Sequence, residues 1–128
     1  MLYPERKVLA VTGDGGFMMN CQEIETAVRM NVPIVVLVMR DDSYGLIKWK
    51  QDDRFGDHCF VDFTNPDFAK MAESMHAVGL RVDKTEQFMN YNKHAFASGK
   101  VCIIDCPVDY AENTKLTEHL KQMIAELE

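Results

Sequence analysis

Two short polar segments of the sequence contain residue types that could bind a phosphate or a metal ion. They are Gly13–Phe17, which is rich in glycine, and Arg40–Gly45, which contains two adjacent acids. Glycines let a backbone approach a ligand closely and present its N–H groups to an anion. Asp14 alone would repel a phosphate, but a divalent cation between the two groups would bridge them. The first segment therefore suggests a site for a phosphate together with a cation.

Asp41 offers a second carboxylate, 27 residues beyond Asp14 (positions 14 and 41). Mg²⁺ prefers oxygen ligands in octahedral geometry, commonly one or two carboxylates completed by phosphate oxygens. The first segment lacks the lysine and hydroxyl residue of a P-loop and the spacing of a dinucleotide fingerprint, so neither of these phosphate motifs applies. By spacing alone, Asp41, Asp42 and Ser43 are more typical of a solvated turn than of a metal site.

The elements that must position these segments alternate between short apolar runs and amphipathic stretches. The apolar runs predict buried strands at Val8–Thr12, Ile34–Met39, Gly79–Val82 and Val101–Asp105. Helical spacing or capping residues predict helices at Cys21–Met30, Leu46–Gln51, Glu86–Ser98 and Leu116–Leu127, and a further helix that starts at Asn65-Pro66-Asp67. Asn20 and Glu23 form a capping pattern for the first helix, and Gln51–Asp62 is expected to be an exposed loop.

Strands that alternate with helices predict an α/β fold, with a parallel sheet and helices on both faces. Ligands of such sheets lie beyond the carboxyl ends of the strands. Both polar segments directly follow predicted strands, so we expect them to meet at that edge of the sheet.

Length and composition limit the possible functions. The chain has 128 residues, a mass of 14.7 kDa and a formal net charge of −6, which indicates one globular domain. Because no basic excess is available to neutralise phosphates, we expect no nucleic-acid partner. No apolar run approaches the length of a membrane span, and Met1–Lys7 lacks the apolar core of a signal peptide. We therefore expect a cytoplasmic protein without a membrane partner.

The longer sequence around the two acids resembles a known family. The triplet Gly13-Asp14-Gly15, followed at this distance by an acid or amide, is similar to the thiamin diphosphate motif. Four stretches resemble in particular the large, catalytic subunit of acetolactate synthase (acetohydroxyacid synthase): Gly13–Arg29, Ser43–Gln51, Val61–Phe63 and Pro107–Tyr110. The resemblance implies that residues 1–128 are the C-terminal part of a diphosphate-binding domain, in an incomplete thiamin diphosphate-binding fold.

The resemblance also implies roles for individual residues. A Mg²⁺ ion would bridge the diphosphate of the cofactor to Asp14, Asp41 and the main-chain carbonyl of Ser43. The residues expected to bind the cofactor are Gly13, Gly15, Gly16, Phe17, Tyr44, Gly45 and Leu46. Ile47 and Lys50 would face the active site.

Two residues depart from the pattern of the family. Biosynthetic relatives often have a tryptophan at the position of Lys50, whereas this chain has Trp49 one place earlier, which leaves the acceptor substrate open. Arg40 replaces the first asparagine of a common Asn-Asn pair, and we expect little effect on metal binding. None of these residues indicates whether the whole enzyme would use FAD.

Whole enzymes that these stretches resemble condense two pyruvates, or pyruvate and another 2-keto acid, with loss of CO2; two pyruvates give acetolactate. The cofactor does the chemistry, and the protein supplies position and proton transfer. The glutamate that assists formation of the reactive carbanion belongs to a pyrimidine-binding domain that this chain lacks. We therefore expect the chain alone to be catalytically incomplete. We also expect it to need that domain from a parent or partner subunit, and to form homo-oligomers through uncovered apolar surface.

Two other functions are compatible with this pattern of elements. The chain could be a non-catalytic interaction or regulatory module that retains the fold. A phospho-receiver domain also has an acid after an apolar strand, but it needs a lysine after a late strand. The last predicted strand here is followed by Cys106 and Pro107 instead of a lysine, which argues against a receiver.

Overall fold

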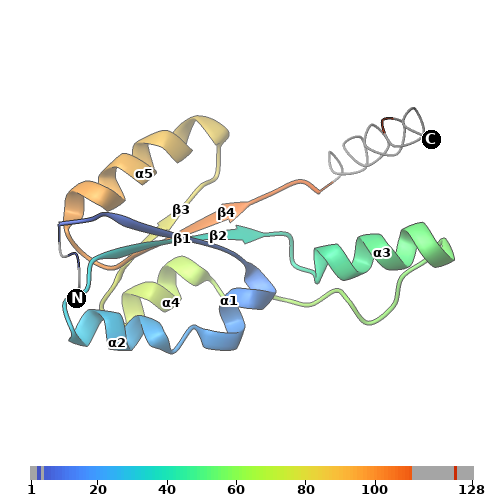
Figure 1. The fold of residues 1–128 in the computed structure, drawn as a ribbon, viewed down its shortest axis with the longest axis horizontal. Helices are drawn as coiled ribbons and strands as arrows, with labels where there is room; N and C mark the ends of the chain where they lie inside the picture. The colour runs from blue at the N-terminus through green and yellow to red at the C-terminus, as the bar shows by residue number, and fades with distance from the viewer. Residues whose placement is uncertain (1–2, 4, 111–122, 124–128) are drawn as a thin grey trace.

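The computed structural model describes residues 3, 5–110 and 123. Along the chain the elements are β1 (Val8–Gly13), α1 (Asp14–Asn20), α2 (Glu23–Arg29), β2 (Ile34–Arg40), α3 (Gly45–Phe55), α4 (Phe68–Ser74), β3 (Val78–Arg81), α5 (Thr85–Ser98) and β4 (Cys102–Pro107). The four strands form one parallel sheet in the order β1-β2-β4-β3 (Figure 1). Within this described part, no helix is long and apolar enough to cross a membrane.

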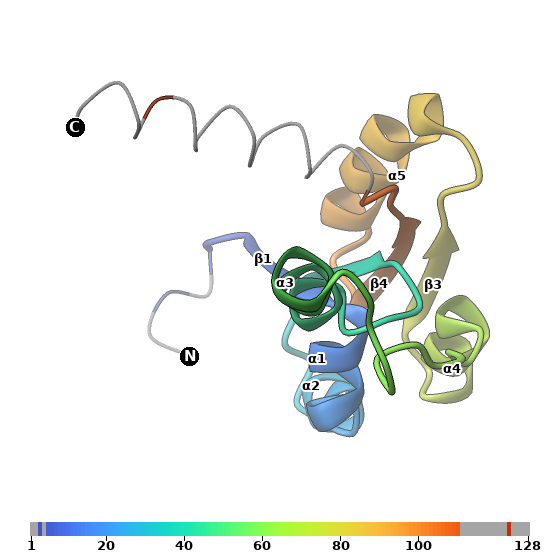
Figure 2. The ribbon, with the colours of Figure 1, turned by 90° about the vertical axis from the view of Figure 1, so that its right-hand side faces the viewer.

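Helices cover both faces of the sheet, which confirms the predicted α/β architecture. Figures 1 and 2 show α1, α2 and α4 on one face and α5 on the other, while α3 extends past the carboxyl ends of the strands. Each face of the sheet has its own hydrophobic cluster. This arrangement follows from the sequence, because continuous apolar runs such as Ile34–Met39 present side chains to both faces.

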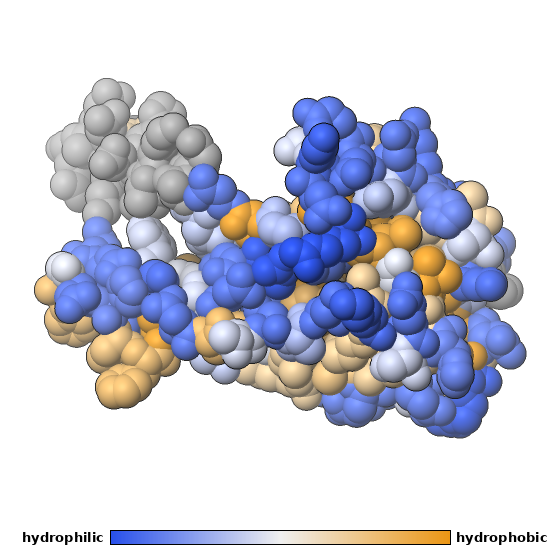
Figure 3. Space-filling view, turned by 180° about the vertical axis from the view of Figure 1, so that it is seen from behind, coloured by the Kyte–Doolittle hydropathy of each residue, from blue (hydrophilic) through white to orange (hydrophobic). Residues whose placement is uncertain are grey.

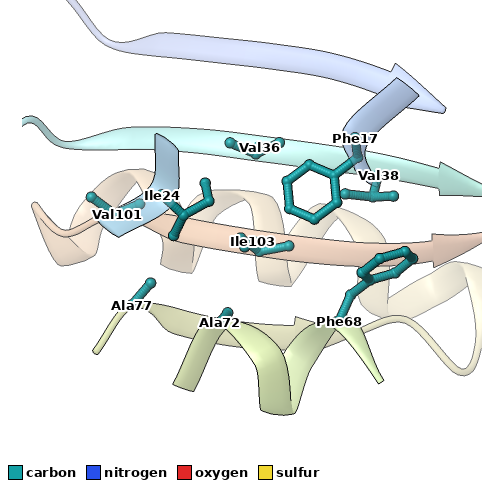
Figure 4. Close-up of a cluster of buried hydrophobic side chains, with 9 residues drawn as sticks. All are labelled: Phe17, Ile24, Val36, Val38, Phe68, Ala72, Ala77, Val101 and Ile103. Carbon is teal, nitrogen blue, oxygen red and sulfur yellow. The ribbon is translucent and has the colours of Figure 1, made fainter. Parts of the chain in front are cut away.

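The hydrophobic cluster on the face covered by α1, α2 and α4 joins α1 and α4 to the central strands. The ring of Phe17 meets the ring of Phe68 edge-on, with centroids 5.4 Å apart and an interplanar angle of 83° (Figure 4). Both rings lie over Val38 and Ile103, which are fully buried. Phe17 therefore fixes α1, and with it the residue that starts this helix, against the sheet.

The register of the strands brings the two polar segments together. Gly13 of β1 pairs with Met39 of β2, so Asp14 and Arg40 follow at the same level of the sheet. On its other side Arg40 pairs with Pro107 of β4. The ends of three strands thus lie side by side, as the sequence predicts for ligand-binding loops of a parallel sheet.

The helix predicted at Cys21–Met30 is wrong at its start. The chain is already helical from Asp14, and Asn20 is the last residue of α1 and caps nothing. A second helix, α2, then runs from Glu23 to Arg29. The glycines at 15 and 16 are poor helix formers, and packing of Phe17 into the core outweighs that local preference.

Two other boundaries differ from the predictions. Helix α3 continues to Phe55, into the segment expected to be a loop, and ends at Gly56, which has a left-handed φ of 75°. The cap of α4 is Asp67, whose side chain accepts a hydrogen bond from the Lys70 N–H, and Asn65 lies before the cap. Helix α5 ends at Gly99 as predicted. The helix predicted at Leu116–Leu127 lies almost entirely outside the described residues.

Some apolar side chains remain exposed. Strand β1 is at an edge of the sheet, and Val8, Leu9 and Val11 are 51%, 41% and 61% exposed. Hydrophobic residues are also visible at the end of the molecule that carries α3, low on the left in Figure 3. Phe55, the last residue of α3, and Phe60 are both exposed. Exposed apolar surface of this kind is a common feature of interaction surfaces.

Candidate functional site

The centre of the candidate site is Asp14, the first residue of α1. It directly follows Gly13, the last residue of β1, and its side chain is only 1% exposed. A buried carboxylate is costly unless hydrogen bonds satisfy it. Oδ1 of Asp14 accepts a hydrogen bond from the Gly15 N–H at 2.8 Å.

The other oxygen of Asp14 connects the first polar segment to the second. Oδ2 accepts hydrogen bonds from the backbone N–H groups of Asp41, at 3.3 Å, and Asp42, at 2.8 Å. It also accepts one from the side-chain amide of Asn65, at 2.7 Å. The carboxylate of Asp14, in the first segment, thus holds the backbone of the second segment in place through these hydrogen bonds.

The second segment is further held by residues 61–63. Ser43 and Asp62 form an isolated antiparallel bridge, the Tyr44 N–H donates to the Val61 carbonyl at 2.8 Å, and the Phe63 N–H donates to the Asp42 carbonyl at 3.0 Å. The hydroxyl of Ser43, a buried residue, donates to Oδ2 of Asp41 at 3.0 Å. These contacts fix the direction in which the Asp41 carboxylate is held.

Two glycines keep the space beside the acids open. A Cβ on Gly15 would lie 2.8 Å from the ring of Tyr44, and a Cβ on Gly45 would collide with Oδ2 of Asp41 and touch the ring of Tyr110. Any other residue at either position would displace its neighbours or fill this space. The glycines of the sequence pattern are therefore required here by close packing around a cavity.

A cavity of about 320 Å³ opens between the two segments and the start of α3. Its lining contains ten of the residues singled out from the sequence, namely Gly13, Asp14, Gly15, Gly16, Asp41, Ser43, Tyr44, Gly45, Leu46 and Ile47, together with Met39 and Tyr110. Two others do not line it. The side chain of Phe17 is in the core, and Lys50 is exposed farther along α3.

The donor set of this cavity suits a cation that a ligand helps to hold. Asp14 and Asp41 contribute two carboxylates to it. Among the described residues, no group of three or more His, Cys, Asp and Glu side chains could hold a metal ion. Two carboxylates and a carbonyl would leave an octahedral ion incomplete, and phosphate oxygens are the usual remaining ligands of Mg²⁺.

An ion-pair network that sequence reasoning missed supports the second segment. Arg40 donates from Nε to Asp105 at 2.9 Å and from Nη1 to Asp42 at 2.9 Å. Burial lowers the pKa of Arg40, but its bonds to these two acids outweigh that effect and the pKa is raised. The hydrogen bond from Asn65, supplemented by Arg40, lowers the pKa of Asp42. In the sequence, Arg40 follows one predicted strand and Asp105 ends another, and these positions are the signal that could have indicated the pair.

A larger cavity, of about 550 Å³, lies on the α5 side of the sheet. Its walls include Leu37, Val82 and Phe88, and it shares only Met39 with the cavity of the two acids. It brings together none of the residues whose chemistry the sequence singled out. Size alone therefore does not make it the better candidate.

Comparison with known proteins agrees with this site. The family model "Thiamine pyrophosphate enzyme, C-terminal TPP binding domain" matches residues 1–106. An acetolactate synthase of Bacillus subtilis is 40% identical over 116 residues, which are 91% of this chain and 20% of that protein. A pyruvate oxidase of Lactiplantibacillus plantarum is 38% identical over 96 residues, which are 74% of this chain and 16% of that protein.

A solved structure shows the same fold at lower identity. The thiamine diphosphate-dependent 4-hydroxybenzoylformate decarboxylase of Rhodococcus jostii superposes with a TM-score of 0.77 at 23% identity, over 83% of this chain and 20% of that one. The chain thus spans about one fifth of the length of the relatives it matches. Because the family model matches most of its length, the chain belongs to the thiamine pyrophosphate enzymes, with a domain of their C-terminal, thiamine pyrophosphate-binding kind.

Proposed function

We propose that this chain anchors the diphosphate of thiamin diphosphate through Mg²⁺, with Asp14, Asp41 and the main-chain carbonyl of Ser43 as the protein ligands. One observation carries the proposal. The buried carboxylate of Asp14 accepts hydrogen bonds from the backbone of Asp41 and Asp42, so that both acids line one cavity that Gly15 and Gly45 keep open. A diphosphate, which is itself an anion, fits this acidic cavity only with a cation between them.

The residues around the cavity then have separate tasks. The backbone of Gly13, Gly15, Gly16 and Phe17 forms one side of the diphosphate site, and that of Tyr44, Gly45 and Leu46 forms the other. Ile47, on the first turn of α3, borders the same cavity. Lys50 extends the active-site face of α3 beyond the cavity. When bound, thiamin diphosphate supplies the nucleophilic carbon that attacks a keto acid, and this chain holds and orients its diphosphate end.

We further propose that residues 1–128 are the C-terminal part of the diphosphate-binding domain of an enzyme that condenses two pyruvates to acetolactate with release of CO2. The match to the acetolactate synthase of Bacillus subtilis extends over 116 residues, against 96 for the pyruvate oxidase, and this longer match favours the condensation over the oxidation named for that relative. Because the chain spans one fifth of these relatives, it is catalytically incomplete alone. A pyrimidine-binding domain, in the parent or a partner subunit of a cytoplasmic homo-oligomer, completes the site. Pyruvate or another 2-keto acid is then the substrate.

Isothermal titration calorimetry tests the anchor directly. Thiamin diphosphate is titrated into the chain with and without Mg²⁺, and into Asp41→Ala and Asp14→Ala variants. Asp41→Ala is the more informative variant, because it disturbs the fold less. The half-buried Asp41 side chain accepts one hydrogen bond, whereas removal of Asp14 leaves several buried donors unpaired. Asp83→Ala removes an exposed acid from the α5 side and is the matched control.

Binding that requires Mg²⁺, survives in the control and is lost in Asp41→Ala is the expected result. Binding that is independent of Mg²⁺, or equal in Asp41→Ala and Asp83→Ala, would refute the assignment of the metal ligands. Absence of binding at millimolar cofactor would instead favour the alternative of a non-catalytic module that retains the fold.

A further inference from the structure

Asn65 contributes two side-chain hydrogen bonds to the candidate site. It lies between the segment 61–63 and the cap of α4, and it is distant in the sequence from Asp14 and Asp42. Its side-chain amide nitrogen donates to Oδ2 of Asp14 at 2.7 Å and to Oδ1 of Asp42 at 2.8 Å. A carboxamide nitrogen carries two N–H groups, so this single group bridges two carboxylates.

The two oxygens of Asp14 are not equivalent. Oδ2 accepts hydrogen bonds from Asp41, Asp42 and Asn65, whereas Oδ1 accepts one bond, from the Gly15 N–H. A carboxylate oxygen offers about two lone-pair directions. Oδ2 is therefore filled by the protein itself, and Oδ1 retains a free direction.

The orientation of the Asn65 amide follows from the charges around it. With the nitrogen toward the two acids, the amide carbonyl is buried and has no hydrogen-bond partner among the described residues. The opposite orientation would place that carbonyl oxygen against two carboxylates, which is less favourable than leaving one acceptor unpaired. The amide of Asn65 thus leaves its buried carbonyl oxygen unpaired, and its nitrogen donates to both Asp14 and Asp42.

Asn65 also connects Asp14 to the ion-pair network. Oδ2 of Asp42 accepts from Arg40, which in turn holds the buried Asp105. Asp42 has a left-handed φ of 55°, which an aspartate tolerates better than most residues. The turn that carries Asp41 is therefore held through both oxygens of Asp42, Oδ1 by Asn65 and Oδ2 by Arg40.

We propose that Asn65 is the positioning residue of the metal site: it engages Oδ2 of Asp14 and leaves Oδ1 as the oxygen offered to the cation. This inference rests on the proposed function for the cation, while the orientation of Asp14 is a property of the chain itself. Loss of the Asn65 amide frees the Asp14 carboxylate to rotate and weakens its hold on the backbone of Asp41 and Asp42. A packing role alone would not have this consequence.

Amide hydrogen exchange of the full chain, measured by NMR, tests the orientation without any ligand. The readout is the exchange of the Asp41 and Asp42 amides relative to the Val38 amide, which lies in the fully buried centre of β2. The variants are Asn65→Ala and Asn65→Asp, which keeps the shape but loses the donors. Asn92→Ala is the matched control, because Asn92 lies on α5 and also has a buried carbonyl oxygen without a partner among the described residues.

We expect the two amides to exchange at least about tenfold faster in both Asn65 variants, as loss of a charge-assisted hydrogen bond implies, and to be unchanged in Asn92→Ala. Retention of protection in Asn65→Asp would show that only shape matters and would overturn the proposal. So would equal exchange in Asn65→Ala and Asn92→Ala.

Calorimetry with Mg²⁺ and thiamin diphosphate then separates the two proposals. Magnesium-dependent binding about tenfold weaker in Asn65→Ala than in Asn92→Ala supports both. Faster amide exchange together with a wild-type chain that binds nothing supports the positioning of Asp14 and refutes the proposed function. Normal binding in Asn65→Ala overturns the positioning proposal.

Discussion

Arg40 and Asp105, at the ends of the neighbouring parallel strands β2 and β4, form an ion pair next to the turn that carries Asp41 and Asp42. Nε of Arg40 lies 2.9 Å from Oδ1 of Asp105, and the two side chains are 15% and 1% exposed. The same guanidinium reaches Asp42. Arg40 thus does more than replace an asparagine of the family pattern, because it ties the turn that carries Asp41 to the centre of the sheet.

Removal of the acid from this pair should destabilise the chain. In Asp105→Leu, Arg40 loses its buried partner but keeps the bond to Asp42. We expect a loss of about 2–3 kcal/mol in the free energy of unfolding, below the value for a fully buried pair because Arg40 retains Asp42 and reaches solvent. The double variant Arg40→Met with Asp105→Leu should recover most of that loss. Urea unfolding measures both, and a double variant no more stable than Asp105→Leu would contradict the ion-pair account.

The contact of Phe17 and Phe68 should be the strongest tertiary anchor of α1. Phe68 is fully buried, so Phe68→Ala should cost about 3–5 kcal/mol of unfolding free energy. Phe55→Ala removes a ring that is 71% exposed and should cost less than about 0.5 kcal/mol. If chemical denaturation gives similar losses for the two variants, the core packing described for α1 and α4 is wrong.

A methyl group on Gly45 should weaken ligand binding while the chain remains folded. Its Cβ would collide with Oδ2 of Asp41 and touch Tyr110, in the cavity itself. We expect magnesium-dependent binding of thiamin diphosphate to weaken by at least about tenfold in Gly45→Ala, as for loss of a charge-assisted contact. The thermal unfolding curve of the variant serves as its control. Unchanged affinity would show that the ligand does not use this cavity.

The stability of α4 should depend on acid pH. The backbone N–H of Lys70, followed by its side chain, lowers the pKa of Asp67 below the ordinary value of 3.8. A carboxyl group whose pKa is lowered by folding adds stability that is fully present above the unfolded pKa and is lost as the pH falls through the folded pKa.

Asp67→Ala should therefore be less stable than the wild type at pH 7, and the difference should shrink between pH 4 and pH 2. Thermal unfolding at a series of pH values measures it, with Asp83→Ala as the control for loss of one exposed acid. A difference between Asp67→Ala and the wild type that stays constant over this range would exclude the cap as its cause.

The exposed edge of the sheet should drive self-association. Val8, Leu9 and Val11 lie open on β1, whose outer edge carries no neighbouring strand in the described structure. Exposed apolar edge strands pair readily with other chains, and a charge on such a strand discourages this. Sedimentation velocity should show association at high micromolar concentration, reduced in Val11→Lys. A wild-type chain that remains monomeric throughout would contradict this expectation.

The strands, and the meeting of the two acids at one edge of the sheet, could be predicted from the sequence because their signals are local. Ile34–Met39 is a continuous apolar run, and Asp14 and Asp41 each follow such a run with one residue in between. The start of α1 could not be predicted, since Gly15 and Gly16 disfavour a helix that is held by the burial of Phe17. In the sequence, Asn65 belongs to the predicted start of a helix. Its partner Asp14 lies 51 residues away, so only the folded chain shows the contact.

In the proposed site, Asp14 and Asp41 bind a cation that holds a diphosphate. The decisive experiment is a crystal structure of the chain grown with thiamin diphosphate and Mn²⁺, which permits the metal to be located by anomalous scattering. We expect one metal peak bound by Oδ1 of Asp14, the carboxylate of Asp41, the carbonyl of Ser43 and two diphosphate oxygens. A diphosphate bound elsewhere, a metal on Oδ2 of Asp14, or crystals at saturating ligand with no peak between the two acids would contradict it.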